Sequence, residues 1–174
     1  MSGIVAGYGQ LSLNDIKKMQ HKISYRGKYN SGIFHKDKVF LGQNYFEADK
    51  GEKSEREIPL YSSNDKDMRI CYDGQMGNWQ VLARQFGILD GPYIEERLLI
   101  SLYKKYHSGM LDYMKDTIFA FVVSDGDVLL AARDNLGIKT LFYGYNKEKT
   151  AIYFATELKS LLEVTDDVYE FPPG

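Results

Sequence analysis

Residues 2–9 read SGIVAGYG, and this stretch indicates the architecture of the protein. Most of its residues are small or apolar, without the polar and apolar alternation of a half-exposed strand. We therefore expect a strand over residues 3–9 that is buried on both faces and closely approached by neighbouring backbone. Such a strand belongs in the interior of a layered fold, and Ser2 places a hydroxyl group at the N-terminal end of this strand.

The segments that follow alternate between extended and helical patterns. Strands are predicted over residues 3–9, 32–36, 38–46, 68–74, 117–125, 128–134, 140–145 and 151–157. Helices are predicted over residues 12–23, 78–87, 93–114 (as two helices broken at Ser108-Gly109) and 157–163. The clearest boundary signals are Ser12 as an N-cap with Asp15 three residues later, a hairpin turn about Lys36-Asp37, and Gly87 as a helix end. Residues 47–57 are polar and aperiodic, which is typical of a surface loop, and residues 170–174 are expected to be extended.

Helix-rich and strand-rich blocks interleave along the chain. There is no internal repeat, low-complexity tract or linker between two domains. A length of 174 residues suits one domain with a sizeable core. The pattern therefore predicts an α+β domain with two layers of mainly antiparallel sheet and helices outside them.

Composition excludes several classes of function. With 22 Lys and Arg against 24 Asp and Glu, the chain lacks the basic character of a nucleic-acid or anionic-membrane binder. No apolar run is long enough to cross a membrane, and the N-terminus lacks a secretory pattern. Cys71 is the single cysteine, so we expect no internal disulfide, no Cys/His metal site and a cytoplasmic location.

Six motifs, in order along the whole chain, carry a family resemblance. They are MSGIV (1–5), RGKYNSG (26–32), DTIFAFVVSD (116–125), ARDNLGIKTLFYG (132–144), YFATELKSLL (153–162) and FPPG (171–174). As a set they closely resemble the class II glutamine amidotransferase domain of glutamine-dependent asparagine synthetases. Taken singly, Arg133-Asp134 could be an ordinary surface ion pair and Gly137 a turn glycine.

The resemblance implies the N-terminal nucleophile hydrolase fold, a four-layer αββα sandwich of two mainly antiparallel sheets. Residues 1–174 would form a single domain that ends where a C-terminal, ATP-dependent synthetase domain begins, in the same or another chain. In active members the initiator Met is removed, a cysteine thiolate attacks the amide of glutamine, and its α-amine carries the proton. The released ammonia goes to the synthetase domain. The amidotransferase domain would need no cofactor, and a homodimer is one state open to it.

The resemblance also assigns the catalytic positions, and several are altered here. Ser2 stands where the family has its cysteine nucleophile. Asp73 and Gly74 match the Asn and Gly that form the oxyanion hole, and Gln75 replaces a carboxylate that faces substrate. A carboxylate in the oxyanion hole carries charge of the wrong sign.

The positions that would hold the rest of glutamine are altered as well. Tyr45 aligns with the arginine that clamps the α-carboxylate, and tyrosine offers no charged bidentate fork. Glu95 matches the Asp that holds the α-amine, with Glu96 as the alternative if the alignment shifts by one residue. While Met1 is attached, the nitrogen of Ser2 lies in a peptide bond and cannot act as the catalytic amine.

Three hypotheses follow for the function. The domain is a non-catalytic module of an asparagine-synthetase-like protein, acting through its contacts with the synthetase domain. Alternatively it is an active hydrolase that uses Ser2 on glutamine or another amide, because Tyr45, Asp73 and Glu95 suit a cationic or aromatic ligand. The third reading is a working glutaminase in which Ser2 replaces the native cysteine by design.

Overall fold

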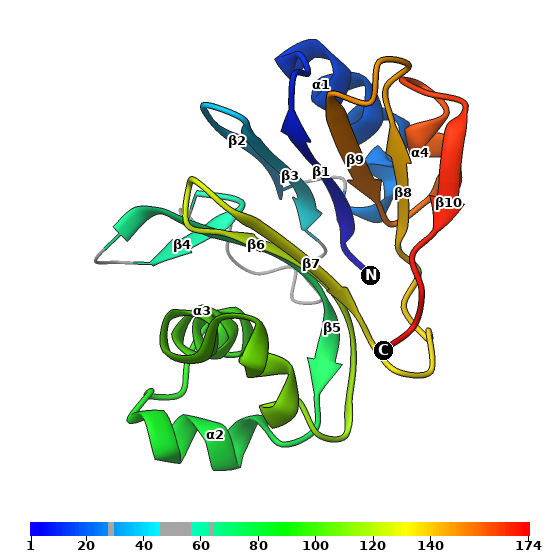
Figure 1. Cartoon of the computed structure of the whole chain (residues 1–174). Helices are drawn as coiled ribbons and strands as arrows, with labels where there is room; N and C mark the ends of the chain where they lie inside the picture. Colours follow the sequence, from blue (N-terminus) through cyan, green and yellow to red (C-terminus); the bar gives the residue numbers. More distant parts are fainter. Residues whose placement is uncertain (28–29, 46–56, 63–64) are drawn as a thin grey trace.

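Two antiparallel sheets face each other, with helices on their outer sides (Figure 1). The structure is a computed structural model and describes residues 1–27, 30–45, 57–62 and 65–174. The predicted surface loop over residues 47–57 lies outside the described residues except for its last position.

The larger sheet has the strand order β10-β8-β9-β1-β3-β2, and the smaller one has the order β4-β5-β6-β7. The strands of the larger sheet are β1 (Gly3–Gly9), β2 (Asn30–Lys36), β3 (Val39–Tyr45), β8 (Phe142–Tyr145), β9 (Ala151–Ala155) and β10 (Asp167–Glu170). Those of the smaller sheet are β4 (Leu60–Ser62), β5 (Asp65–Met76), β6 (Thr117–Ser124) and β7 (Leu129–Arg133). The helices are α1 (Leu13–Lys22), α2 (Trp79–Phe86), α3 (Ile94–Tyr106) and α4 (Leu158–Leu161), with 3-10 turns η1 (Ser24–Arg26) and η2 (His107–Tyr113).

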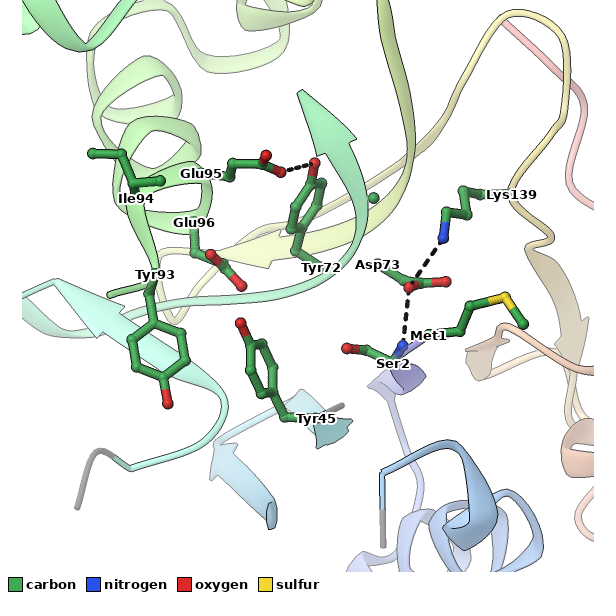
Figure 2. A pocket seen from close by; sticks show the side chains of 11 residues that line it. Met1, Ser2, Tyr45, Tyr72, Asp73, Tyr93, Ile94, Glu95, Glu96 and Lys139 are labelled. Carbon is green, nitrogen blue, oxygen red and sulfur yellow. Dashed lines mark hydrogen bonds and ion pairs between the residues drawn. The ribbon is translucent and has the colours of Figure 1, made fainter. Parts of the chain in front are cut away.

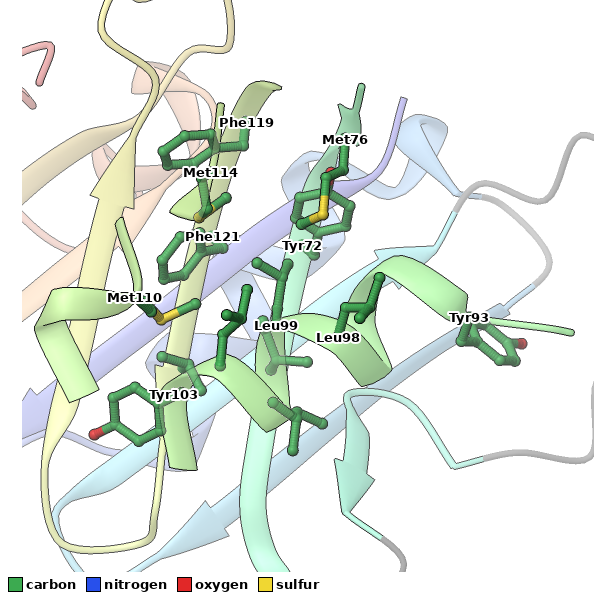
Figure 3. Packing of buried hydrophobic residues seen from close by; sticks show 14 of the residues in the cluster. Tyr72, Met76, Tyr93, Leu98, Leu99, Tyr103, Met110, Met114, Phe119 and Phe121 are labelled. Atoms are coloured by element: carbon green, nitrogen blue, oxygen red, sulfur yellow. The ribbon is translucent and has the colours of Figure 1, made fainter. Parts of the chain in front are cut away.

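Three buried clusters separate four layers, which confirms the predicted αββα arrangement. One cluster joins the two sheets and includes Ile4 of β1 and Val122 of β6. A second lies between the larger sheet and the α1 and α4 layer. The third packs α2, α3 and η2 on the smaller sheet, and Leu98 and Leu99 of α3 share this cluster with Phe121 of β6 (Figure 3). Each such fully buried aliphatic or aromatic side chain contributes about 1.5–3 kcal/mol through removal from water.

Strand β1 is the interior strand that its sequence predicts. It pairs with β3 on one side and β9 on the other, and Ile4, Val5 and Ala6 are fully buried. A Cβ on Gly42 of β3 would lie 2.7 Å from a methyl carbon of Val5, so the neighbouring strand does approach closely. Ser2, which precedes β1, is therefore held at a fixed place at the end of a central strand.

The local signals at helix ends are also confirmed. Ser12 forms a capping box with Asp15, with both hydrogen bonds at 3.1 Å, and α1 buries Ile16 and Met19 against the sheet. Gly87 ends α2 with φ of 62°, a conformation that a residue without Cβ adopts at little cost.

Other boundaries differ from the sequence prediction. The hairpin turns at Asp37 (φ 49°) and the following residue, one position later than expected. The break after α3 falls at His107 (φ 50°), and the second segment is a 3-10 helix. Strand β10 has no counterpart in the prediction, since it is specified by pairing with β8 rather than by local alternation. None of the helices in the described part of the chain is long and apolar enough to cross a membrane.

Candidate functional site

A cavity of about 360 Å³ opens beside Ser2, at the start of β1. Figure 2 shows side chains from the two sheets and from the N-terminal end of α3 around it. It is lined by Met1, Ser2, Tyr45, Tyr72, Asp73, Gly74, Tyr93, Ile94, Glu95, Glu96 and Lys139. Of the six positions assigned from the sequence, five therefore meet at one cavity, although they come from the residue before β1 and from β3, β5 and α3.

Ser2 and Asp73 form the centre of the site. The backbone N–H of Ser2 donates to Oδ1 of Asp73 at 2.9 Å, and both residues are buried, with 7% and 6% of their surface exposed. The side chain of Ser2 lies on the cavity side, between Met1 and Tyr45 (Figure 2). A hydroxyl and a carboxylate thus share the wall of the cavity.

Two cations compensate the buried charge of Asp73. Nζ of Lys139 lies 3.3 Å from Oδ1, and Nη2 of Arg26 lies 3.5 Å from Oδ2. Arg26 also contacts the carboxylate of Glu157 at 2.9 Å. A buried carboxylate is costly without partners, so these contacts explain how the interior tolerates Asp73. We call Ser2, Asp73, Arg26 and Lys139 the paired end of the site.

The loop between β7 and β8 holds Lys139 in place. The carboxylate of Asp134 accepts backbone N–H groups from four residues, including that of Lys139 at 2.9 Å. Arg133 donates to the carbonyl oxygens of Gly137 (2.7 Å) and Lys139 (2.6 Å). Gly137 has φ of 65°, and a Cβ there would lie 2.7 Å from the Arg133 guanidinium. Arg133 and Asp134 are therefore loop-fixing residues, and the reading of them as a surface ion pair is wrong.

The opposite end of the cavity is acidic and aromatic. We call Tyr45, Tyr72, Tyr93, Glu95 and Glu96 the acidic end. The hydroxyl of Tyr72 donates to Oε2 of Glu95 at 2.6 Å, and burial, followed by the nearby Glu95 carboxylate, raises the pKa of Tyr72. The rings of Tyr45 and Tyr93 lie 5.2 Å apart at 58°. The two glutamates occupy the first turn of α3, where the helix dipole favours anions.

Glu96 is the more buried of the two carboxyl groups, with 5% of its surface exposed. Burial raises its pKa from 4.5 to about 7, although hydrogen bonds from its own backbone and from Tyr45 oppose the shift. Figure 2 shows the Tyr45 hydroxyl directed at this carboxyl group. The group therefore changes charge near neutral pH, at the wall of the cavity.

Gly74 and Gln75 have different placements. A Cβ on Gly74 would lie 2.6 Å from the Ile118 carbonyl oxygen and from the Tyr72 ring, so only glycine fits between β6 and the cavity wall. Gln75 is exposed and does not line the cavity, contrary to its expected place facing a substrate. It shares a face of β5 with Asp73 but lies two residues further along the strand, where that face is exposed although Met76 on the other face is buried.

Three further residues contribute to the site: Arg26, Lys139 and Glu96. Arg26 and Lys139 lie in motifs quoted for the resemblance, but they are 113 positions apart in the chain, and only folding brings both to Asp73. The usable signal was that a buried Asp requires cationic partners. Glu96 was named only as an alternative to Glu95, and both line the cavity.

The chain's single cysteine, Cys71, is fully buried between the sheets, and burial raises the pKa of its thiol, so it is not a nucleophile of this cavity. Across the described ranges there is no group of three or more His, Cys, Asp or Glu side chains arranged to hold a metal ion.

Comparison with solved structures identifies the fold. The Bacillus subtilis glutamine phosphoribosylpyrophosphate amidotransferase structure, complexed with ADP and GMP, superposes with a TM-score of 0.80 at 18% identity, covering 99% of this chain and 46% of that one. A structure described as the allosteric regulatory enzyme of purine biosynthesis gives a TM-score of 0.83 at 18% identity, covering 99% of this chain and 45% of that one. The protein has the N-terminal nucleophile hydrolase fold of these amidotransferases.

Sequence comparison then gives the family. The family described as glutamine amidotransferase domain matches residues 1–171. A probable asparagine synthetase [glutamine-hydrolyzing] of Acanthamoeba polyphaga mimivirus is 34% identical over 126 residues, 71% of this chain and 22% of the relative. Asparagine synthetase B [glutamine-hydrolyzing] of Escherichia coli is 29% identical over 166 residues, 90% of this chain and 28% of the relative. The chain belongs to the class II glutamine amidotransferase domains of the asparagine synthetase family, and it spans less than a third of the length of these relatives.

Proposed function

We propose that this chain is an amidotransferase-like domain that does not hydrolyse glutamine. In this proposal it acts through contacts with an ATP-dependent synthetase domain, in the same or another polypeptide. The contact between Ser2 and Asp73 carries the proposal: the carboxylate accepts the Ser2 N–H at 2.9 Å. Asp73 occupies the position assigned to the oxyanion hole. Its carboxylate accepts a hydrogen bond there and has no hydrogen to donate to an oxyanion.

The chemistry of amide hydrolysis makes this contact unfavourable. Attack on the amide carbonyl creates a negative oxygen that must be met by hydrogen-bond donors, and removing one donor slows such enzymes by about 10²–10³-fold. At Asp73 a negative acceptor replaces the donor. Arg26 and Lys139 offset the charge of Asp73. The guanidinium group of Arg26 and the ammonium group of Lys139 are therefore already paired with carboxylates.

The nucleophile adds to the same argument. A serine hydroxyl is almost entirely un-ionised at neutral pH and needs a base. While Met1 remains attached, the amino group belongs to Met1, and burial lowers its pKa while the Asp73 carboxylate partly opposes this. The nitrogen of Ser2 is then an amide engaged with Asp73 and is not a base.

The altered substrate positions support the same reading. Tyr45 contacts Glu96 and offers no cation for the α-carboxylate of glutamine. Lys139, the basic side chain among the described residues that line the cavity, pairs with Asp73 at the other end, where the N-terminal ammonium group of Met1 also lies near Asp73. Glutamine would place its carboxylate beside Glu95 and Glu96.

The synthetase partner is proposed because the relatives named as asparagine synthetases are more than three times longer than the matched region. We further propose that the domain works in the cytoplasm and carries no cofactor of its own. Whether it forms a homodimer is measured directly by light scattering of the purified chain.

Glutamate release from glutamine tests the proposal. The matched series is the wild type, Ser2→Ala as the blank, Ser2→Cys, Ser2→Cys with Asp73→Asn, and that pair with Tyr45→Arg added. Mass spectrometry of each N-terminus reports removal of Met1. We expect glutamate only from the triple variant after Met1 is lost.

Release by the wild type above the Ser2→Ala blank would overturn the proposal. Release restored by Ser2→Cys alone would do the same, because it would show that only the nucleophile had been replaced.

A second candidate function is hydrolysis of another amide by Ser2. The observation that favours it is the open cavity, which Ser2 still lines together with the acidic end. It requires loss of Met1 and a ligand matched to the present wall.

A further inference from the structure

The cavity wall is divided by charge. At the paired end, Asp73 contacts both Lys139 and Arg26, so its charge is met by protein cations. At the acidic end, the Tyr72 hydroxyl donates to Glu95, and Glu96 is hydrogen-bonded by the Tyr45 hydroxyl and by its own backbone. Arg97, which donates to the carbonyl oxygen of Leu89, adds only a weaker electrostatic interaction with Glu96. A hydroxyl donor shares a proton but supplies no opposite charge.

The shape of the acidic end suits a small cation. The rings of Tyr45 and Tyr93 lie 5.2 Å apart and tilted by 58°, beside the first turn of α3 that carries the two glutamates. Tyrosine faces attract ammonium groups, and a nearby carboxylate adds a charged hydrogen bond. The cavity volume of about 360 Å³ falls at the small end of the range for ligand sites, which is about 300–1,000 Å³.

We propose that the acidic end binds the primary ammonium group of a ligand that carries no neighbouring carboxylate, with the ligand's uncharged polar end toward Ser2. This inference concerns the cavity described above and rests on the proposed lack of a partner for the α-carboxylate of glutamine. The ligand class is thus an ω-amino amide or a similar short amine, rather than an α-amino acid.

The selectivity has a simple electrostatic origin. A carboxylate attached next to the ammonium group would lie against Glu95 and Glu96, and it would lose water without gaining a cation. A ligand with the ammonium group alone meets both carboxyl groups favourably. Binding of the cation also favours the ionised form of Glu96.

Calorimetry with a matched pair of probes tests the inference. The pair is 4-aminobutanamide and L-glutamine, which differ only by the α-carboxylate; butanamide, which lacks the amine, is the third probe. We expect 4-aminobutanamide to bind the wild type at least about tenfold more tightly than either other probe, a factor that corresponds to about one hydrogen-bonded charge contact.

Two variants locate the binding site. Glu95→Gln and Glu96→Gln keep an acceptor for the tyrosine hydroxyls but remove the charge, and each should weaken 4-aminobutanamide binding about tenfold. Glu163→Gln, at an exposed glutamate that pairs with Lys22 outside the cavity, is the matched control and should leave binding unchanged. Tyr45→Arg should reverse the preference toward glutamine.

The inference is overturned if glutamine binds as tightly as 4-aminobutanamide, if no probe binds, or if both cavity variants bind like Glu163→Gln. Calorimetry needs no turnover, so it is independent of glutamate release. If the protein releases glutamate and also binds the amine selectively, only the proposed function is contradicted. If it neither releases glutamate nor binds the amine, only this inference is contradicted.

Discussion

The protonation of Glu96 gives the most exacting prediction about stability. Burial raises the pKa of this carboxyl group from 4.5 to about 7 in the folded protein. Between these two values the folded state holds a proton that the unfolded chain has released. The free energy of unfolding therefore falls as the pH rises through this interval. Above the pKa of the folded state, the contribution of Glu96 to stability has been lost completely.

The size of the effect follows from the shift. At about 1.4 kcal/mol per pKa unit, a carboxyl group moved from 4.5 to about 7 costs the folded protein about 3 kcal/mol when fully ionised. About 2 to 3 kcal/mol of this cost appears between about pH 5 and about pH 8. Glu96→Gln should remove this dependence, because glutamine keeps an acceptor for Tyr45 without a charge.

Urea unfolding of the wild type and Glu96→Gln at these two pH values measures the effect, since the other titrating groups cancel in the difference. We expect Glu96→Gln to gain about 2 to 3 kcal/mol relative to the wild type on going from about pH 5 to about pH 8. The control is Glu163→Gln. The hydrogen bond from Lys22 lowers the pKa of Glu163, so the stability of this variant relative to the wild type should change with the opposite sign, and at acid pH. Parallel stability curves for the wild type and Glu96→Gln would refute the reasoning.

Three further predictions concern the framework of the site. Gly74→Ala places a Cβ 2.6 Å from backbone and ring atoms, so its melting temperature should fall sharply. Gly109→Ala is the control, because its Cβ would lie 3.9 Å from the nearest atom, and it should melt near the wild-type temperature; equal melting temperatures of the two variants would contradict the packing argument. Ser12→Ala loses the cap of α1 and should reduce the free energy of unfolding by about 1 kcal/mol in urea titration, and no loss would contradict the capping role. Asp134→Asn leaves backbone N–H groups of the loop with poorer acceptors and should lower the free energy of unfolding by about 1–3 kcal/mol. Amide hydrogen exchange at Lys139 should become faster, and unchanged exchange would show that other contacts fix the loop.

The parts of the fold that were predictable are those with local signals. The strand after Ser2, the capped helix after Ser12 and the helix end at Gly87 each carry their cause within a few residues. Strand β10 and the break at His107 were not predictable in this way, because pairing with β8 and packing of α3 on the smaller sheet specify them.

The candidate site shows the same division. Matching of motifs selected Ser2, Tyr45, Asp73, Gly74 and Glu95, and the structure gathers these five around one cavity. It selected Gln75 as well, which the structure leaves exposed. Motif position alone does not tell how far along a strand the buried wall extends.

By itself, the sequence determined the family, the layered fold and the location of a hydroxyl at the start of a buried strand. These depend on short-range patterns and on motifs in a fixed order. Only the tertiary structure decided the electrostatics of the cavity, because Arg26 and Lys139 come from segments far apart in the chain to meet Asp73. Glu95 and Glu96 likewise come with α3 to meet Tyr72 and Tyr45, respectively. The charge of a buried group depends on its neighbours in space, and folding, not chain order, selects those neighbours.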